Sequence, residues 1–210
     1  MGLAEVLRTH RLLGIVRGRD PQASLRTVVT LVEQGVEVVE VSLTTADALG
    51  VLAGARRELG PAAHLGAGTV LAAQDVRHAA DAGASFMVTP ALCDAIESAR
   101  SAGLPVLAGA FTATEVVGAN ARGAAGVKLF PASLGGPGYL RALRDPFPRT
   151  AFVPVGGVDA VAAEQYLKAG AAAVGVGSPL VGDAADGGDI EGLRRRARAF
   201  LAAVTRGGPE

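Results

Sequence analysis

Short apolar segments alternate with amphipathic segments of helical periodicity along this 210-residue chain. We expect the apolar segments to be strands of a parallel sheet, because strands buried on both faces are apolar throughout. Apolar residues at helical spacing predict helices between them, as in residues 20–34 and 73–82. The predicted strands are residues 12–17, 36–43, 63–68, 85–89, 105–110, 126–130, 151–156 and 172–177.

Several of the predicted helices end in a glycine directly before the next strand. Glycine readily adopts the left-handed conformation that closes a helix, and several of these glycines recur at about 20 to 25 residues, the length of one βα unit. Eight such units without a long linker favour one α/β domain over residues 1–210, a closed (β/α)8 barrel with a short N-terminal helix. An open doubly wound sheet normally has fewer strands. The glycines are Gly35, Gly83, Gly103, Gly123 and Gly170.

Charge and composition argue against several classes of function. Lys+Arg and Asp+Glu number 20 each, whereas a nucleic-acid surface needs concentrated positive charge. The arginines of 194–198 are interpreted as the solvated face of a last helix, after a loop at 182–189. No segment is a membrane span or a secretory signal, so we expect a cytoplasmic protein. The three histidines lack ligand spacing, so no metal is expected, and Cys93 is interpreted as a small packed side chain.

Two charged residues interrupt predicted strands. Alternation along residues 36–43 places Glu40 on the face opposite Val39 and Val41, and Lys128 is opposite Val127 and Leu129 in the same way. The apolar sets should pack against helices, so Glu40 and Lys128 should point into the barrel, toward the end where this fold carries its active sites.

The chain has only two lysines, Lys128 and Lys168, so each one is informative. A lysine amine attacks a carbonyl only when unprotonated, which burial favours, and a neighbouring carboxylate such as Glu40 can shuttle protons. The alternative is a structural ion pair within a barrel layer, although such pairs gain little net stability. Lys168 ends a predicted helix, where it should complement the helix dipole in solvent.

Glycines follow the seventh and eighth predicted strands, where barrels commonly bind phosphate through backbone N–H groups. The candidate residues are Gly156, Gly157, Gly177 and Ser178, although glycines also serve ordinary tight turns.

Two further residues could bind a carboxylate at the mouth. Arg17 closes the first strand and could make a two-pronged contact, or it could lie in solvent on the rim. Thr69 could donate its hydroxyl to the same carboxylate, or it could instead cap the following helix.

The ordered segments GIVRG, VEVSLTT, GAGTVL, MVTPAL, FTATE, VKLFPA, VPVGGV and VGVGS resemble the KDPG/KHG aldolases, from about residue 12 to residue 200. These class I aldolases act on 2-keto-3-deoxy-6-phosphogluconate and related 2-keto acids. The resemblance implies a (β/α)8 barrel that needs no cofactor, forms a homotrimer, and cleaves its substrate to pyruvate and an aldehyde.

The resemblance also assigns roles by position. Lys128 corresponds to the Schiff-base lysine and Glu40 to the general acid/base, while Arg17 and Thr69 correspond to carboxylate binders. Pro90 would line the pocket, and Gly156, Gly157, Gly177 and Ser178 match the phosphate-binding positions.

The chain departs from the family pattern at positions that bear on the substrate. Thr44 stands where some members carry Arg, so Arg17 is expected to take that role, as in the phosphogalactonate branch. TATE replaces the common TPTE and again resembles that branch, and Val155 replaces a frequent Thr. These differences leave open the gluconate or galactonate epimer and 4-hydroxy-2-oxoglutarate.

Two other functions fit the residues taken alone. One is a phosphate-binding barrel isomerase or synthase in which Glu40 and Lys128 transfer protons without a covalent step. The other is a catalytically silent anion-binding barrel.

Overall fold

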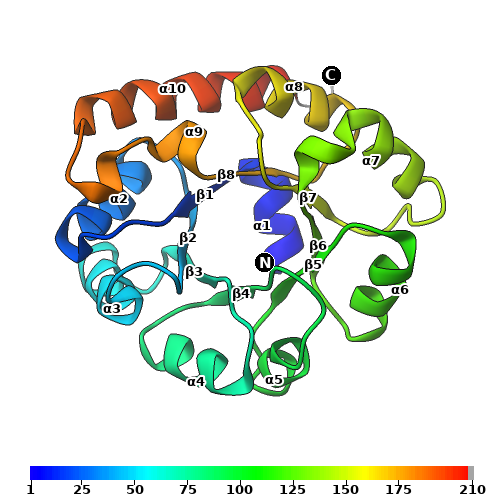
Figure 1. Ribbon diagram of the computed structural model, residues 1–210, viewed down its shortest axis with the longest axis horizontal. Coiled ribbons are helices and arrows are strands. Elements are labelled where there is room, and N and C mark those ends of the chain that lie inside the picture. The colour runs from blue at the N-terminus through cyan, green and yellow to red at the C-terminus, as the bar shows by residue number, and fades with distance from the viewer. Residues whose placement is uncertain (208–210) are drawn as a thin grey trace.

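The computed structural model describes residues 1–207, and its eight strands form one parallel sheet in the order β7-β6-β5-β4-β3-β2-β1-β8. A bridge between Val155 and Gly175 joins the two end strands, so the sheet is a nearly closed barrel (Figure 1). The predicted (β/α)8 barrel is confirmed. The strands are β1 (Leu12–Val16), β2 (Val38–Ser42), β3 (His64–Gly68), β4 (Phe86–Val88), β5 (Val106–Ala110), β6 (Gly126–Leu129), β7 (Phe152–Pro154) and β8 (Val174–Val176).

Helices surround the barrel as an outer ring (Figure 1). The two helices predicted at 20–34 and 73–82 are α2 and α4, and all five predicted glycines have positive φ, between 74° and 95°. The helices are α1 (Leu3–His10), α2 (Pro21–Glu33), α3 (Ala48–Leu59), α4 (Ala73–Asp81), α5 (Ala95–Ser101), α6 (Ala113–Ala121), α7 (Gly136–Arg144), α8 (Ala160–Lys168), α9 (Ser178–Val181) and α10 (Ile190–Arg206), with short 3-10 helices η1 (Ala132–Leu134) and η2 (Ala184–Asp186).

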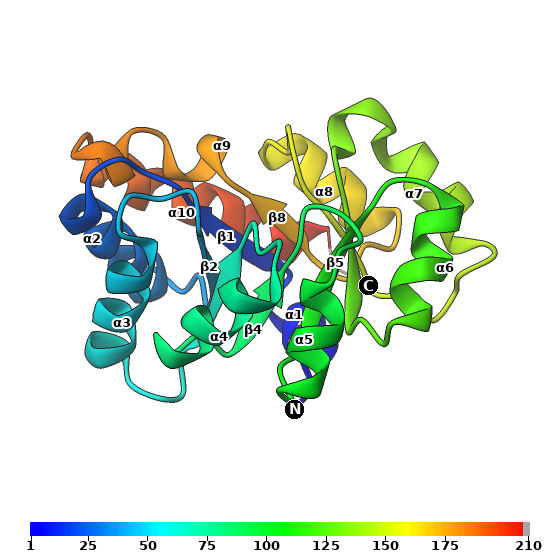
Figure 2. The same cartoon turned by 60° about the horizontal axis from the view of Figure 1, so that its bottom comes forward.

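Two apolar clusters stabilise the barrel. The larger one lies between the strands and the ring of helices and includes Val39, Val41 and Val127. The smaller one fills the barrel interior, where Phe86 and Leu107 meet Leu7 of α1. Helix α1 lies below the strands and covers this end of the barrel (Figure 2). The covered end carries the N-termini of the strands, so the opposite end is the one left open.

The structure refines the interpretation of the last predicted helix. The stretch 182–189 contains the short helix η2, and α10 begins at Ile190. Arg196 is half-buried and donates to the carbonyl oxygens of Leu180 and Val181, both at 2.8 Å. Arg196 therefore ties α9 to α10, and the prediction that the whole arginine cluster is a solvated face was wrong for this residue. No helix within residues 1–207 is both long and apolar enough to span a membrane.

Candidate active site

The two charged strand residues lie on the inner face of the barrel. Val39 and Val41 of β2 pack in the outer cluster with Val127 of β6, so the alternate residues Glu40 and Lys128 face inward. Both are nearly inaccessible, since Glu40 is 1% exposed and Lys128 is 6% exposed. Barrel strands that alternate in this way therefore bring a buried carboxyl group and a buried amine to the same interior face.

A cavity of about 360 Å³ opens at the C-terminal ends of the strands. All nine residues singled out in the sequence line it, although they come from seven different strands or the loops that follow them. They are Arg17, Glu40, Thr69, Pro90, Lys128, Gly156, Gly157, Gly177 and Ser178.

Glu40 is buried without a complete set of hydrogen bonds. Its Oε2 atom has no hydrogen-bond partner within the described part of the chain. Burial raises the pKa of this carboxyl group above its ordinary value of 4.5, and the positive charges of Lys128 and Arg17 oppose that rise. Burial has the larger effect, so Glu40 binds a proton more readily than an exposed glutamate does, which suits a group that gives and takes protons.

Gly68 makes room for Glu40. A Cβ atom at Gly68 would lie 2.4 Å from Oε1 of Glu40, which is far closer than atoms can approach. The glutamate carboxyl group therefore lies directly on the backbone of β3. Gly68, the second glycine of the segment GAGTVL, thus provides the space that the carboxyl group of Glu40 occupies.

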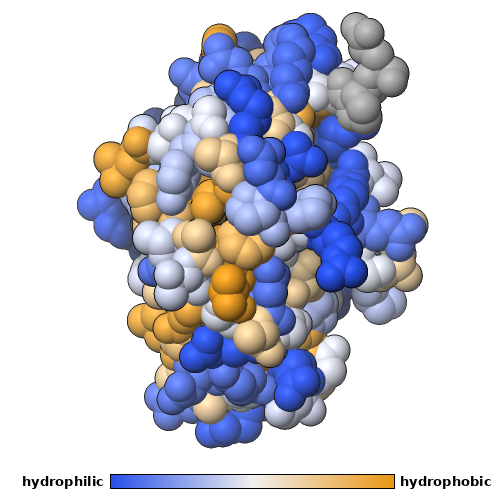
Figure 3. Space-filling model, turned by 90° about the vertical axis from the view of Figure 1, so that its right-hand side faces the viewer, coloured by the Kyte–Doolittle hydropathy of each residue, from blue (hydrophilic) through white to orange (hydrophobic). Residues whose placement is uncertain are grey.

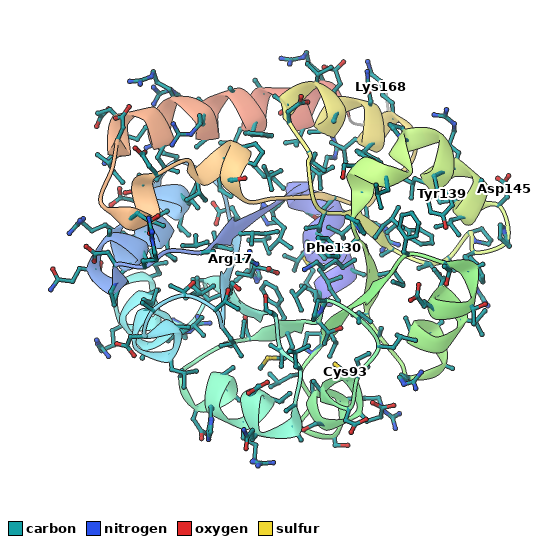
Figure 4. All side chains as sticks on the ribbon, viewed as in Figure 1. Arg17, Cys93, Phe130, Tyr139, Asp145 and Lys168 are labelled. Atoms are coloured by element: carbon teal, nitrogen blue, oxygen red, sulfur yellow. The ribbon has the colours of Figure 1, made fainter. Side chains whose placement is uncertain are left out.

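Lys128 extends toward the opening. Its Nζ atom lies 5.2 Å from the centre of the Phe130 ring, within the range of a cation–π contact. Phe130 is 40% exposed and lines the cavity, and with Arg17 it lies over the middle of the ring of strands (Figure 4). Lys168, in contrast, lies on the periphery, as the last residue of α8, with Nζ 2.6 Å from Glu164. The two lysines therefore occupy the environments that the sequence predicted.

Arg17 follows β1 and lies at the entrance of the cavity. Arg17 is exposed, yet its positive charge acts on Glu40, where it opposes the rise in the pKa of the carboxyl group that burial causes. The arginine thus lies on the rim, as one sequence interpretation expected, and it also lines the cavity, while its binding of a carboxylate stays a prediction.

Thr69 is held in a left-handed backbone conformation, with φ at 59°, which is uncommon for a residue other than glycine. Its hydroxyl group forms a 2.9 Å hydrogen bond with the hydroxyl of Ser42, which in turn lies 2.8 Å from the hydroxyl of Thr44. Thr69 does not cap the following helix, because α4 begins at Ala73 with Ala72 as its N-cap residue, and the hydroxyl of Thr69 is bonded to Ser42 instead. The helix-cap alternative is therefore wrong, and the threonine side chain faces the cavity.

The glycine loops after β7 and β8 form one side of the opening. Gly156 and Gly157 have φ of 99° and 73°, and a Cβ at Gly157 would lie 2.8 Å from Ser133. Both the backbone conformation and the close approach of η1 therefore require glycine. Ser178 begins α9, directly after Gly177, and its side chain is exposed to the cavity.

Sequence reasoning missed the apolar side chains that line the cavity and the hydrogen bonds that join the hydroxyl groups of Thr69, Ser42 and Thr44. Ile15, Val155 and Phe130 line the cavity, and alternation from Lys128 was a signal that could have identified Phe130 as a lining residue. Ser42 is fully buried and lies on the same inner face of the strand as Glu40. Alternation along the strand predicts that face for Ser42, but it does not predict the hydrogen bond to Thr69.

A (β/α)8 barrel with a buried lysine and glutamate at the C-terminal ends of its strands has the architecture of a barrel enzyme. The family model described as KDPG and KHG aldolase matches residues 3–194. The chain belongs to this family, whose members are aldolases, and it is therefore a lyase.

Relatives and solved structures agree with this assignment. The chain is 36% identical over 194 residues to a probable 2-dehydro-3-deoxy-6-phosphogalactonate aldolase of Rhizobium meliloti, covering 91% of this chain and 90% of the relative. It is 34% identical to 2-dehydro-3-deoxy-6-phosphogalactonate aldolase of Escherichia coli, covering 91% and 93%. The solved structure described as native KDPGal superposes with a TM-score of 0.88 at 33% identity, covering 93% of this chain and 95% of that one.

Proposed function

We propose that this aldolase is a class I enzyme that cleaves a 2-keto-3-deoxy-6-phospho sugar acid to pyruvate and glyceraldehyde 3-phosphate through a Schiff base on Lys128. The observation that carries the proposal is the placement of a buried amine beside a buried, incompletely bonded carboxyl group in one cavity. A side chain that served only to neutralise Lys128 would not be expected to leave Oε2 of Glu40 without a partner.

The reaction begins when the neutral amine of Lys128 attacks C2 of the keto acid to give a carbinolamine, which loses water to form an iminium ion. Glu40, through a water molecule, takes the proton of the C4 hydroxyl group. The C3–C4 bond breaks, the aldehyde leaves, and the bonding electrons pass into the iminium to form an enamine. Protonation at C3 and hydrolysis of the imine release pyruvate and the free amine.

Glu40 suits the proton transfers because burial raises its pKa and because its Oε2 atom has no hydrogen-bond partner among the described residues. Positive charges of Lys128 and Arg17 keep the ionised form accessible, so the group can accept a proton and later return it.

The two ends of the substrate would be recognised by different parts of the cavity. Arg17 and Thr69 would bind the carboxylate of the pyruvyl half, with Pro90 lining this part of the cavity. The hydrogen bond from the hydroxyl group of Ser42 would orient the hydroxyl group of Thr69.

The phosphate would bind at Gly156, Gly157, Gly177 and Ser178, where glycines allow close approach to backbone N–H groups. These residues come after β7 and β8, the position at which barrels of this architecture commonly hold phosphate.

We infer the galactonate series as the preferred substrate. The two relatives above are named for 2-dehydro-3-deoxy-6-phosphogalactonate, and TATE and Thr44 of this chain resemble that branch. Cleavage of 4-hydroxy-2-oxoglutarate to pyruvate and glyoxylate is a second activity to be measured, because it needs the pyruvyl half of the site but not the phosphate half.

Trapping with borohydride tests the covalent step. Incubation with pyruvate and sodium borohydride should add one reduced pyruvyl group to Lys128, seen by intact-mass analysis and peptide mapping. A Lys128→Met variant should gain no mass, and a Lys168→Met variant should behave as the wild type, which makes it the matched control. Cleavage without any trapped adduct would instead favour non-covalent proton transfer by Glu40 and Lys128.

We also propose a homotrimer, as the family resemblance implies. Apolar residues are interspersed with polar ones on the face that carries α6 and α7 (Figure 3). Val117 of α6 and Leu134 of η1 are 56% and 76% exposed, which is unusual for large apolar side chains. Light scattering should give three times the chain mass, and a monomer for the Leu134→Asp variant would place the interface at η1.

A further inference from the structure

A second cavity, of about 680 Å³, lies at the end of the barrel opposite the candidate active site. It is lined where α1, α7, α8 and α10 end and where β1, β7 and β8 begin, which places it beside the helix that covers the barrel floor. Its described lining residues include five cations and no acidic side chain. The cations are Arg8, Arg11, Arg144, Lys168 and Arg206.

Hydrogen bonds hold part of this cationic group in place. Glu164 accepts from Lys168 Nζ at 2.6 Å and from Arg206 Nε at 3.2 Å, so one carboxylate positions two cations. Arg144 donates to the carbonyl oxygen of Ala169 at 3.2 Å. The side chains of Lys168 and Arg206 are nevertheless each 60% exposed, so both can still reach a ligand.

Compensation of helix dipoles explains only part of the charge. The four helices that end here each present a partial charge of about −0.5 at the C-terminus, and basic residues commonly lie there for that reason. With the single charge of Glu164 included, about two positive charges remain uncompensated among the described residues. An excess of this size fits a ligand that carries two or more negative charges.

We propose that this cavity is a second anion site, which binds a small phosphorylated molecule with at least two negative charges. Arginine forks match phosphate oxygens, and four of the five cations are arginines. The concave shape and a volume within the range of ligand pockets favour a small molecule over a nucleic acid, whose backbone follows an extended basic surface. Leu167 and Ala151 provide an apolar part of the wall for the rest of such a ligand.

Calorimetric titration with inorganic tripolyphosphate, in a buffer free of other polyanions, tests the proposal. The variant Arg8→Gln/Arg206→Gln should bind at least about tenfold more weakly than the wild type, because charge-assisted contacts are lost. The control Arg26→Gln/Arg77→Gln removes the same net charge from exposed sites on α2 and α4 and should bind within about twofold of the wild type. Arg8→Gln/Lys168→Gln, which leaves Arg206 and Glu164 intact, repeats the test should the first variant unfold.

A variant of the other cavity separates the two sites. Ser178→Asp should weaken binding at the barrel mouth and leave the tripolyphosphate affinity of the second cavity unchanged. If Arg26→Gln/Arg77→Gln weakened tripolyphosphate binding as much as Arg8→Gln/Arg206→Gln does, the weakening would reflect only the overall charge of the protein. If only Ser178→Asp lost tripolyphosphate binding, the tripolyphosphate would be bound at the barrel mouth. Either result would overturn the proposal, whether or not the Schiff base is trapped on Lys128.

Discussion

Replacement of Gly68 by alanine should impair catalysis while leaving the fold intact. The added Cβ would lie 2.4 Å from Oε1 of Glu40, whereas ordinary contacts begin near 3.4 Å, so the carboxyl group must move by about 1 Å. The displaced atom is the end of a flexible side chain, so the barrel can absorb the change. A misplacement of about 1 Å at a catalytic group can cost on the order of a hundredfold in rate, and we expect kcat to fall by about that factor.

Pyruvate release coupled to lactate dehydrogenase measures this prediction, with thermal unfolding as the check of folding. Gly14→Ala is the matched control, because a Cβ on this strand glycine would contact only apolar side-chain ends at 3.3 Å or more. The control should keep kcat within about threefold of the wild type, since its position faces α2 and α9. A folded Gly68→Ala enzyme with wild-type kcat would refute the reasoning that the position of Glu40 limits the reaction.

Three further predictions concern charge and support of the site. The activity of the wild type should be lost as the pH falls through the raised pKa of Glu40, so the acid limb of the pH–rate profile should lie above 4.5. The variant Glu40→Gln should lower kcat by about 10²- to 10⁴-fold and should show no such acid limb. Ser178→Asp should raise KM at least about tenfold for the phosphorylated substrate by placing a negative charge beside the phosphate, yet leave KM for 4-hydroxy-2-oxoglutarate nearly unchanged; equal effects on both would contradict a phosphate site there. Arg196→Ala removes the bonds to Leu180 and Val181, so urea unfolding should show a loss of about 1–3 kcal/mol, and an unchanged midpoint would show that α9 does not depend on them.

Alternation of side chains along strands explains why much of the site was predictable. Strand residues face inward or outward with a period of two, so Glu40 and Lys128 were placed inside the barrel by the valines and leucine beside them. Glycines marked five of the helix ends that precede strands, because positive φ is a local backbone requirement. The site residues that were predicted are therefore those whose placement follows from local pattern.

Residues that depend on distant partners were not predictable in this way. Ser42 contacts Thr69, 27 positions along the chain, and no local pattern indicates that pair. Arg196 was interpreted as solvated because helical spacing cannot show that the carbonyl oxygens of α9 lie within its reach. The helix-cap interpretation of Thr69 was wrong for a similar reason, since the hydroxyl of Thr69 bonds to the distant Ser42 and the helix begins only after Ala72.

By itself, the sequence determined the βα alternation, the inward direction of Lys128 and Glu40, and membership of an aldolase family, because these depend on short-range periodicity and on motifs. Only the tertiary structure decided how deeply Glu40 is buried, that Gly68 confines its carboxyl group, and that cations from four helices meet below the barrel. These features arise when the barrel closes, since closure brings together residues far apart in the chain and removes water from between them.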